Sequence, residues 1–554
     1  MSHYIRHVYI RHPGSIFIVL SLLSTMLLLL TACSGASTPT SSTRNNGATT
    51  TATKQILKFP NVGTSDVATL DPATGPDANS AIAVGMIYTG LVKTDKDLNV
   101  VPDQATWQIS SDNKVYTFTL NPAVTFSDGT PVTAHSYIYT WTRALLPQVD
   151  SEIAPTLEAP IVGASDVTSG KATILRGLKA IDDHTLQITL TQPSDYFLKA
   201  LTNPLFFPLN QKVIEQYGQK KWIQYVANNG AGTGPFQLKE WDHNIKMVFT
   251  PNPHYYGNKT KLKEVDMIFV NDPATAYTTY RAGQYDFVWG LTPDDQVAAK
   301  GSAGFTRMPL LQTDLLFFDN TQPPFNNVKV RQAFAESIDK TSLVHVVFED
   351  SVTPAPTILP PAIPGYQAGY AGLPFDRQQA KALLQSVYPD ITGLPHITFS
   401  YPSSQVSAGE AGFLQQMWQN VLNVYVDMRP VELNAYLDEE QKDEIPFGFT
   451  QWTSDFPDPY DWLAVNLLST ASNNNGQWQN ATFDQTVMQA EKLTGAARLT
   501  MYDKAEQIAI TDVGWLPLDH QTLAAVIPPT VHGITLNSNG LYFGDWSNVY
   551  ISQH

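Results

Sequence analysis

Side chains that could catalyse a reaction or bind a metal are widely scattered in this sequence. Nine histidines follow residue 12, and no two of them lie within ten residues of each other, which excludes HExxH and every other local pair of histidine ligands. The sequence also has no GxSxG motif, no phosphate-binding P-loop and no GxGxxG turn. We therefore expect no catalytic activity, metal or cofactor, with an exported hydrolase whose site is assembled from distant segments as the alternative.

Three aspartates recur at every third position in the segment Ser454-Asp-Phe-Pro-Asp-Pro-Tyr-Asp461. Prolines interrupt the segment, and it lacks the central glycine that an EF-hand calcium loop needs for its sharp turn. We interpret the segment as a proline-rich turn in which Asp458 and Asp461 are solvated.

The chain has a single cysteine, Cys33, which cannot form a disulfide within the chain. It follows a basic start and an apolar run over residues 16–30, which is short for a bilayer span of about 20 residues and typical of an export signal. The residues Leu30-Thr-Ala-Cys33 resemble the bacterial lipobox, in which signal peptidase cuts before a cysteine that carries the lipid. We predict a signal peptide over residues 1–32 and lipidation of Cys33. An ordinary signal peptide or membrane anchor with an incidental cysteine is the alternative.

Residues 33–53 predict a flexible tether between this cysteine and a folded region. Eleven of the twenty residues 34–53 are serine or threonine, so the segment cannot bury enough apolar surface to offset its loss of conformational entropy. Removing residues 1–32 from the 554 leaves 522 residues, more than one hydrophobic core of about 250–300 residues accommodates. We therefore expect more than one lobe.

The charge balance excludes nucleic acid as a partner. The chain has 34 lysines and arginines against 50 acidic residues, a net charge of -16. The net charge becomes -18 without residues 1–32, because that segment holds two arginines and no acidic residue. Phosphate binding needs a surplus of basic side chains on at least one face.

Apolar periodicity predicts strands and helices along the chain. Residues 115–120 and 184–190 alternate apolar and polar side chains, as half-exposed strands do. Residues 132–145 and 413–424 predict amphipathic helices with one apolar face each. These faces consist of Tyr137, Trp141 and Leu145 in the first helix and Leu414, Trp418, Val421 and Leu422 in the second. We expect both faces to pack in a core rather than to bind a cofactor.

Short motifs follow one another through most of the chain. In order they are Leu70-Asp-Pro72, Tyr88-Thr-Gly-Leu-Val92, Tyr116-Thr-Phe-Thr-Leu120, Phe126-Ser-Asp-Gly-Thr-Pro-Val-Thr-Ala134, Tyr139-Thr-Trp-Thr-Arg143, Lys179-Ala-Ile-Asp-Asp-His-Thr-Leu186, Gly232-Thr-Gly-Pro-Phe236, Tyr280-Arg-Ala-Gly-Gln-Tyr-Asp286, Pro324-Phe-Asn-Asn-Val-Lys-Val-Arg331, Gln451-Trp-Thr-Ser-Asp455, Phe483-Asp484 and Tyr502-Asp-Lys-Ala-Glu506. In this order and spacing they resemble the peptide-binding proteins of bacterial ABC importers, solute-binding protein family 5, which includes the oligopeptide- and dipeptide-binding proteins.

The resemblance implies an α/β fold of the two-lobed, periplasmic-binding-protein-like type II (cluster C), with an extra subdomain inserted in the first lobe. Lobe I would comprise residues 54–98, 201–308 and 525–554, the inserted subdomain residues 99–200, and lobe II residues 310–523. Two crossover strands would fall near residues 310–320 and 515–523. Lobes joined in this way can hinge and enclose a ligand, and a monomer is expected.

The resemblance also implies where a ligand would lie. In the oligopeptide binders, an extended peptide adds a strand to edges of the protein. The matching residues here are Gln451, Trp452 and Thr453 in lobe II and Pro76, Asp77 and Ala78 in lobe I. Asp455 occupies the place of the carboxylate that holds the peptide's α-ammonium group. Phe449 stands where those proteins have an arginine that helps to bind a ligand carboxylate, which leaves open longer peptides or a ligand without that carboxylate.

We therefore predict a non-enzymatic, lipid-anchored receptor at the outer face of the cytoplasmic membrane. It would bind extracellular peptides between its lobes and deliver them to the permease of an ABC importer. Because other members of the family bind different solutes, a nickel chelate, an oligosaccharide or an opine is the alternative ligand. Tryptophans that suit a sugar are Trp107, Trp141, Trp222, Trp241, Trp289, Trp452, Trp462 and Trp478. A folding helper that binds unfolded proteins is an alternative of another class.

Overall fold

The computed structural model describes residues 55–74, 77–151, 153–403, 408–540 and 544–552. The predicted signal peptide, the lipidation site Cys33 and the tether lie outside the described residues, as does Pro76. All described residues belong to one unit, Thr53–His554. Within them, no helix combines the length and the apolar character that crossing a membrane requires.

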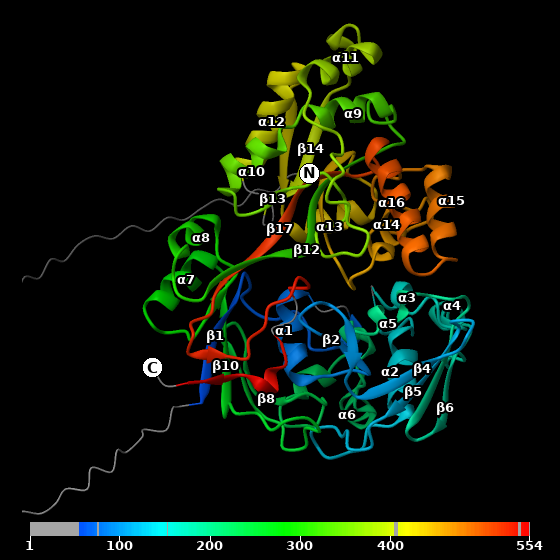
Figure 1. The fold of residues 1–554 in the computed structure, drawn as a ribbon, viewed down its shortest axis with the longest axis vertical. Helices are drawn as coiled ribbons and strands as arrows, with labels where there is room; N and C mark the ends of the chain where they lie inside the picture. Colours follow the sequence, from blue (N-terminus) through cyan, green and yellow to red (C-terminus); the bar gives the residue numbers. More distant parts are fainter. Residues whose placement is uncertain (1–54, 75–76, 152, 404–407, 541–543, 553–554) are drawn as a thin grey trace, which may run out of the picture. The chain divides into compact units, whose positions relative to one another are not determined.

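The first sheet has four strands in the order β1-β10-β9-β8. They are β1 (Ile56–Val62), β8 (Phe236–Asp242), β9 (Lys246–Pro251) and β10 (Glu264–Val270). Helix α1 (Ala78–Ile87) packs on this sheet, because Leu57 and Phe59 share a buried core with Ile82 and Met86. Three further helices surround the sheet in Figure 1, namely α6 (Gln211–Tyr217), α7 (Pro273–Arg281) and α8 (Pro293–Ala299).

The second sheet is antiparallel, with the order β4-β5-β7-β6. Its strands are β4 (Ala105–Ile109), β5 (Val115–Leu120), β6 (Leu178–Asp182) and β7 (Thr185–Thr189). The strands predicted from alternation are thus confirmed as β5 and β7. The predicted helix over residues 132–145 is α2 (Ala134–Ala144), and Tyr137 and Trp141 are fully buried in its core. The short helices α3 (Ala154–Leu157), α4 (Ala164–Thr168) and α5 (Phe197–Ala200) complete this part.

The third sheet has the order β11-β17-β12-β16-β14-β15, with β13 also paired to β17. Its strands are β11 (Val288–Trp289), β12 (Phe305–Phe318), β13 (Thr353–Pro354), β14 (Ile397–Pro402), β15 (Val426–Val431), β16 (Phe447–Thr453) and β17 (Leu516–Val526). The second predicted helix, over residues 413–424, is confirmed up to Leu422, where α12 (Ala408–Leu422) ends, and its Leu414 and Trp418 are fully buried against this sheet.

Helices cover the third sheet and account for much of the yellow and orange part of Figure 1. They are α9 (Val328–Glu336), α10 (Lys340–Phe348), α11 (Arg377–Val387), α13 (Leu433–Gln441), α14 (Pro459–Leu467), α15 (Ala481–Ala490) and α16 (Gly495–Thr511). Two-residue and three-residue strands form the pairs β2 (Val92–Thr94) with β3 (Val100–Pro102), and β18 (Val531–His532) with β19 (Tyr550–Ile551). Single-turn 3-10 helices occur at Pro72–Thr74, Pro204–Phe206, Trp222–Tyr225, Ile391–Gly393 and Trp546–Asn548.

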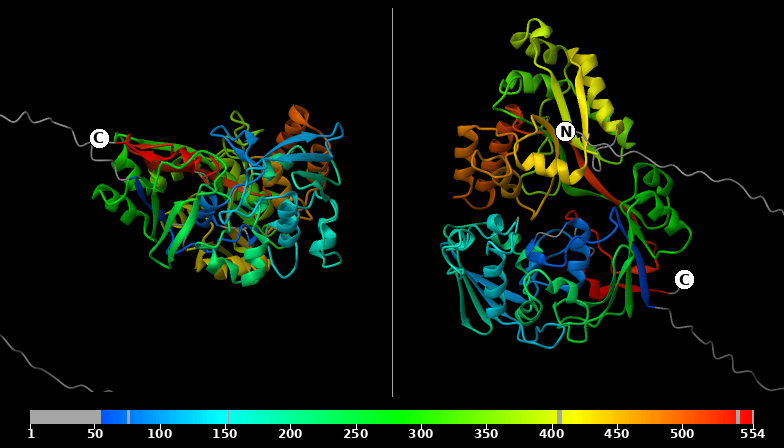
Figure 2. Two further views of the ribbon diagram at one scale, coloured as in Figure 1. Left: turned by 90° about the horizontal axis from the view of Figure 1, so that it is seen from below. Right: turned by 180° about the vertical axis from the view of Figure 1, so that it is seen from behind.

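Two long strands connect the parts of the fold. β12 and β17 pair in an antiparallel manner from Phe305 opposite Val526 to Leu316 opposite Leu516. One end of the pair shares a core with strands β1 and β10, and the other end belongs to the core under α12. Figure 2 shows both strands passing between the two regions from a second direction. Both segments predicted as crossovers are therefore β-strands, whereas the lobe boundaries stay a prediction.

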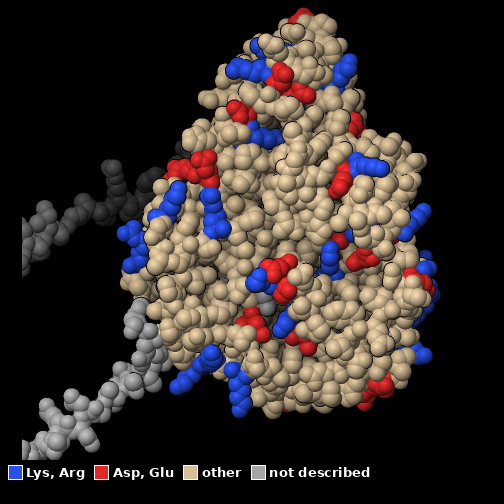
Figure 3. Space-filling view, in the orientation of Figure 1, with Lys and Arg blue, Asp and Glu red and all other residues tan. Residues whose placement is uncertain are grey.

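Charged side chains are sparse on the surface. Only 15% of the residues are charged, and on the face shown in Figure 3 blue and red side chains are interspersed over a mostly uncharged surface. The charges that line one pocket should therefore attract or repel a ligand more strongly than the charges scattered over this face.

Candidate ligand-binding site

The C-terminal end of β16 has one edge that is not paired with a strand. β16 pairs with β12 along its whole length, from Phe447 opposite Phe318 to Thr453 opposite Gln312. On its other edge it meets β14 only at Gly448, opposite Ser400. Among the described residues, no strand therefore pairs with that edge at residues 451–453, and an unpaired edge is the kind of surface to which an extended ligand can add a strand.

Side-chain hydrogen bonds fix two residues at this end of β16. Gln451 Nε2 donates to Asp314 Oδ1 at 2.7 Å, and Trp452 Nε1 donates to Asp461 Oδ2 at 3.2 Å. Thr453 is exposed. Gln451, Trp452 and Thr453 thus lie at the end of one strand, and none of them lines the pocket described below. Their contact with a ligand stays a prediction.

Asp455 follows this strand and presents a free carboxylate. Its backbone N–H donates to Asp461 Oδ2 at 3.0 Å, and its carbonyl accepts from Asn203 Nδ2 at 3.3 Å. Its carboxylate accepts no hydrogen bond from the described residues and lines a pocket. The side chain is half-buried, and loss of water around it raises the pKa of Asp455 to about 6. An acceptor of this kind is suited to a cationic donor.

The prediction that Asp458 and Asp461 are solvated is wrong. Asp461 is fully buried, and its Oδ2 also accepts from Ser454 Oγ at 3.1 Å. Asp458 is 1% exposed, caps α14 by accepting from the backbone N–H of Tyr460, and binds Arg498 with both carboxylate oxygens, at 2.6 and 3.0 Å. A guanidinium from a helix that begins 37 residues later compensates the Asp458 charge, which no local pattern reveals.

The pocket that Asp455 lines encloses about 100 Å³, less than the usual range of about 300–1,000 Å³ for ligand pockets. Its opposite wall comes from α1, from residues 88–103 and from residues 544–546. Four charged residues line it, namely Lys93, Asp103, Asp455 and Asp545. Three carboxylates against one ammonium favour a ligand with positive charge.

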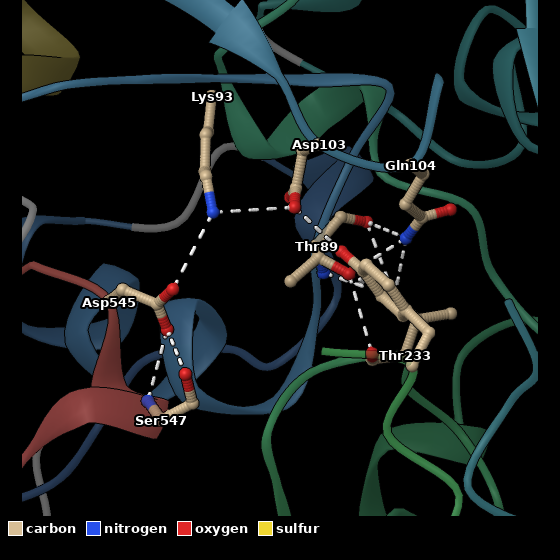
Figure 4. A network of polar contacts seen from close by, with 8 residues as sticks. Thr89, Lys93, Asp103, Gln104, Thr233, Asp545 and Ser547 are labelled. Carbon is tan, nitrogen blue, oxygen red and sulfur yellow. Dashed lines mark hydrogen bonds and ion pairs between the residues drawn. The ribbon is translucent and has the colours of Figure 1, made fainter. Parts of the chain in front are cut away.

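A polar network fixes the wall opposite Asp455 (Figure 4). Lys93 Nζ lies 3.6 Å from both Asp103 Oδ1 and Asp545 Oδ2, between the two carboxylates. Burial raises the pKa of Asp103, an effect that Lys93 and the hydroxyl of Tyr256 partly offset. Sequence reasoning missed these residues, because they come from separate segments and belong to no motif that suggested a ligand.

The described residues of the predicted lobe I segment, Asp77 and Ala78, do not line the pocket. Asp77 caps α1, where its Oδ1 accepts from Ser80 N at 2.6 Å, and Ala78 is the first residue of that helix. Both side chains are exposed and neither lines the pocket, which α1 reaches through Ala81 and Gly85. Any role of Asp77 and Ala78 in ligand binding therefore stays a prediction.

Phe449 is buried in the core of the third sheet. Its carbonyl accepts a hydrogen bond from the hydroxyl of Tyr436. This position therefore supplies no cation to the pocket, and among the pocket-lining residues the one cation is Lys93.

Residues 196–203 contact the loop that follows β16. The ring of Tyr196 stacks on Tyr460 with centroids 4.0 Å apart and on Phe456 at 5.5 Å. Lys199 Nζ lies 3.2 Å from Asp458 Oδ2. At the pocket itself, the bond from Asn203 to the Asp455 carbonyl joins these residues to the loop that carries Asp455.

Comparison with known proteins places this chain in a family. The family model described as "Bacterial extracellular solute-binding proteins, family 5 Middle" matches residues 99–474. The probable deoxycholate-binding periplasmic protein YgiS of Escherichia coli strain K12 is 31% identical to the chain over 520 residues, which cover 91% of the chain and 95% of that protein.

Solved structures agree in fold. The murein tripeptide binding protein MppA of Escherichia coli matches with a TM-score of 0.79 and 28% identity, over 91% of the chain and 99% of MppA. OppA of Haemophilus influenzae in complex with RPPGFSPFR matches with a TM-score of 0.77 and 25% identity, over 90% and 99%. The predicted two-lobed α/β fold of cluster C is thereby confirmed. The chain belongs to family 5 of the bacterial extracellular solute-binding proteins, a family of receptors rather than enzymes.

Proposed function

We propose that this protein is an extracytoplasmic receptor that binds peptides in the pocket beside Asp455 and delivers them to the permease of an ABC importer. One observation carries the proposal. The carboxylate of Asp455, which accepts no hydrogen bond from the described residues, lies just beyond a strand end with one unpaired edge. A peptide offers the two matching groups, an α-ammonium for Asp455 and a main chain for the edge of β16.

The other solute classes have weaker support. A deoxycholate anion would enter a pocket whose charged side chains are three carboxylates and one lysine, which repel a carboxylate overall. Half of the eight tryptophans that would suit an oligosaccharide are core residues, since Trp141, Trp222, Trp462 and Trp478 are at most 1% exposed, and none of the eight lines the pocket. No described residue favours a nickel chelate or an opine over a peptide.

Ligand identification tests the proposal directly. Mass spectrometry of the small molecules released from the purified protein is expected to find peptides, and calorimetry with a defined peptide mixture is expected to show saturable binding. Deoxycholate serves as the competing ligand in the same titration. Binding of deoxycholate without binding of any peptide would overturn the assignment.

Peptide affinity should depend on pH through Asp455. Its pKa of about 6 in the free protein falls when a peptide ammonium binds, because the positive charge favours the carboxylate. Binding therefore releases a proton below pH 6, and the affinity is expected to fall roughly tenfold per pH unit there and to be flat from about pH 6.5 to 7.5. Calorimetry at several pH values checks this, with Asp455→Asn as the variant expected to show no such dependence.

The Asp455 carboxylate should also make the stability of the ligand-free protein depend on pH, but here a higher pH is unfavourable. Its folded pKa lies above the ordinary value of 3.8, so the folded protein binds more protons than the unfolded chain between those values. The stabilising contribution of Asp455 is therefore complete below about pH 4 and is lost as the pH rises through about 6.

Tyr196 should favour the arrangement in which the pocket is closed. Tyr196→Leu keeps apolar bulk but removes the stacking on Tyr460 and Phe456, worth about 0.5–1.5 kcal/mol. The ratio of open to closed protein is then expected to rise roughly 2- to 12-fold, seen as a larger radius of gyration in small-angle scattering of the ligand-free protein. Tyr217→Leu, which removes stacking on Tyr225 near α6, is the control expected to scatter like the wild type.

The attachment to the membrane is part of the same proposal. Cys33 follows an apolar run and precedes a segment rich in serine and threonine, an order that supports lipidation at the outer face of the cytoplasmic membrane. The wild-type protein is expected to partition into detergent on phase separation and the Cys33→Ser variant into water. Equal partitioning of the two would contradict the anchor.

A further inference from the structure

Three buried carboxylates meet beneath the strand that carries Gln451. Asp314 of β12, Glu410 of α12 and Asp519 of β17 are 4%, 2% and 0% exposed. One carboxylate oxygen from each lies within 4.8 Å of the others. The three come from positions far apart in the sequence, and none of them lines the pocket beside Asp455.

The pairing of strands β12 and β17 places two of these carboxylates opposite each other, which destabilises the fold unless a positive charge compensates them. Asp314 and Asp519 are directly opposite each other in the β12–β17 pair, and like charges at opposed positions of a sheet destabilise it. Among the groups that act on the pKa of Asp519, Lys340 is the one with a positive charge. Its ammonium group donates a hydrogen bond to the carbonyl of Ala355 at 2.9 Å. Among the described residues, neither Asp314 nor Asp519 forms an ion pair with a lysine or arginine.

One oxygen of the cluster has no partner. Oδ2 of the fully buried Asp519 accepts no hydrogen bond in the described part of the chain, although it is hidden from water. Its other oxygen and Asp314 Oδ2 both accept from Gln521 Nε2 at 2.8 Å. A buried acceptor left without a donor is expensive, and a cation bound between the carboxylates would remove this cost.

We propose that this cluster binds one Ca²⁺ ion. Three ionised carboxylates carry three negative charges, and a divalent cation balances two of them. The ligands are all oxygens, the atoms that Ca²⁺ prefers, and the amides of Gln451 and Gln521 supply further oxygens when they rotate.

The ligand set favours Ca²⁺ over Mg²⁺. All three carboxylates are buried, so an ion between them would be bound by protein oxygens with little room for water. Ca²⁺ accepts such sites in flexible geometry, whereas Mg²⁺ usually keeps several of its waters in a strict octahedron.

Metal analysis of the full-length protein tests this site without any peptide. After dialysis against about 1 mM CaCl₂ and then metal-free buffer, plasma mass spectrometry is expected to find about one Ca²⁺ per chain. Thermal unfolding is expected at a lower temperature in a chelator than in Ca²⁺, with no comparable effect of Mg²⁺. No bound Ca²⁺ and equal melting temperatures would show that protons neutralise the cluster, and would overturn the proposal.

Variants locate the ion. Asp519→Asn and Asp314→Asn are each expected to reduce the bound Ca²⁺ from about one per chain to near zero. Glu158→Gln removes a carboxylate that is also fully buried but lies in the core around the second sheet, and it should retain the ion. Retention of Ca²⁺ by both aspartate variants would place the ion elsewhere and overturn the site, and the wild-type comparison stands even if a variant fails to fold.

Discussion

Replacement of Arg498 by alanine is expected to lower the free energy of unfolding by about 3–5 kcal/mol. The Arg498 and Asp458 side chains are 4% and 1% exposed and form two hydrogen bonds. Removal of one partner of such a pair leaves the other charge buried, which is the costly outcome. Lys199, at 3.2 Å from Asp458 but with a side chain 27% exposed, compensates only in part. Urea denaturation of the ligand-free protein measures the effect.

A matched surface pair provides the control. Lys442→Ala removes an ion pair with Asp438 in which both side chains are more than half exposed, so its effect should stay within about 0.5 kcal/mol. The double variant Arg498→Met/Asp458→Asn should recover part of the lost stability, because no uncompensated charge remains. An Arg498→Ala protein within about 1 kcal/mol of the wild type would show that the pair does not stabilise the fold.

Replacement of Asp455 by alanine is expected to weaken peptide binding by about 1.5–3 kcal/mol, roughly 10- to 150-fold in Kd. The reason is the loss of a charge-assisted hydrogen bond between its carboxylate and the peptide's α-ammonium in a pocket with little water. The fold should tolerate the change, because the carboxylate accepts no hydrogen bond from the described residues. Calorimetry with one tight-binding peptide measures the loss.

An acetylated peptide separates this bond from other effects of the variant. Acetylation removes the ammonium charge, so it should weaken binding to the wild type about as much as Asp455→Ala does. In the Asp455→Ala protein, acetylation should have little further effect, which is the signature of two groups that contact each other. Unchanged affinity in the variant would remove Asp455 from the site while leaving peptide binding itself intact.

Local sequence patterns predicted several elements closely. Residues 115–120 were expected as a strand and are β5, because alternation with a period of two is a property of the strand alone. Trp141 and Trp418 were expected in core faces and are fully buried, because helical spacing puts them on one side of a helix. Family membership also followed from the order of short motifs and is confirmed by the comparisons.

The sequence by itself determined strands β5 and β7, helix α2, most of helix α12 and the family of the chain, and through the resemblance to that family it predicted Asp455 as a ligand-binding residue. Only the tertiary structure decided that Asp458 is buried, since its partner Arg498 stands 40 residues away. The same holds for the wall formed by Lys93, Asp103 and Asp545 and for the pairing of Asp314 with Asp519. Periodicity reports on neighbours within a few residues, whereas these charges meet only after the chain has folded back on itself.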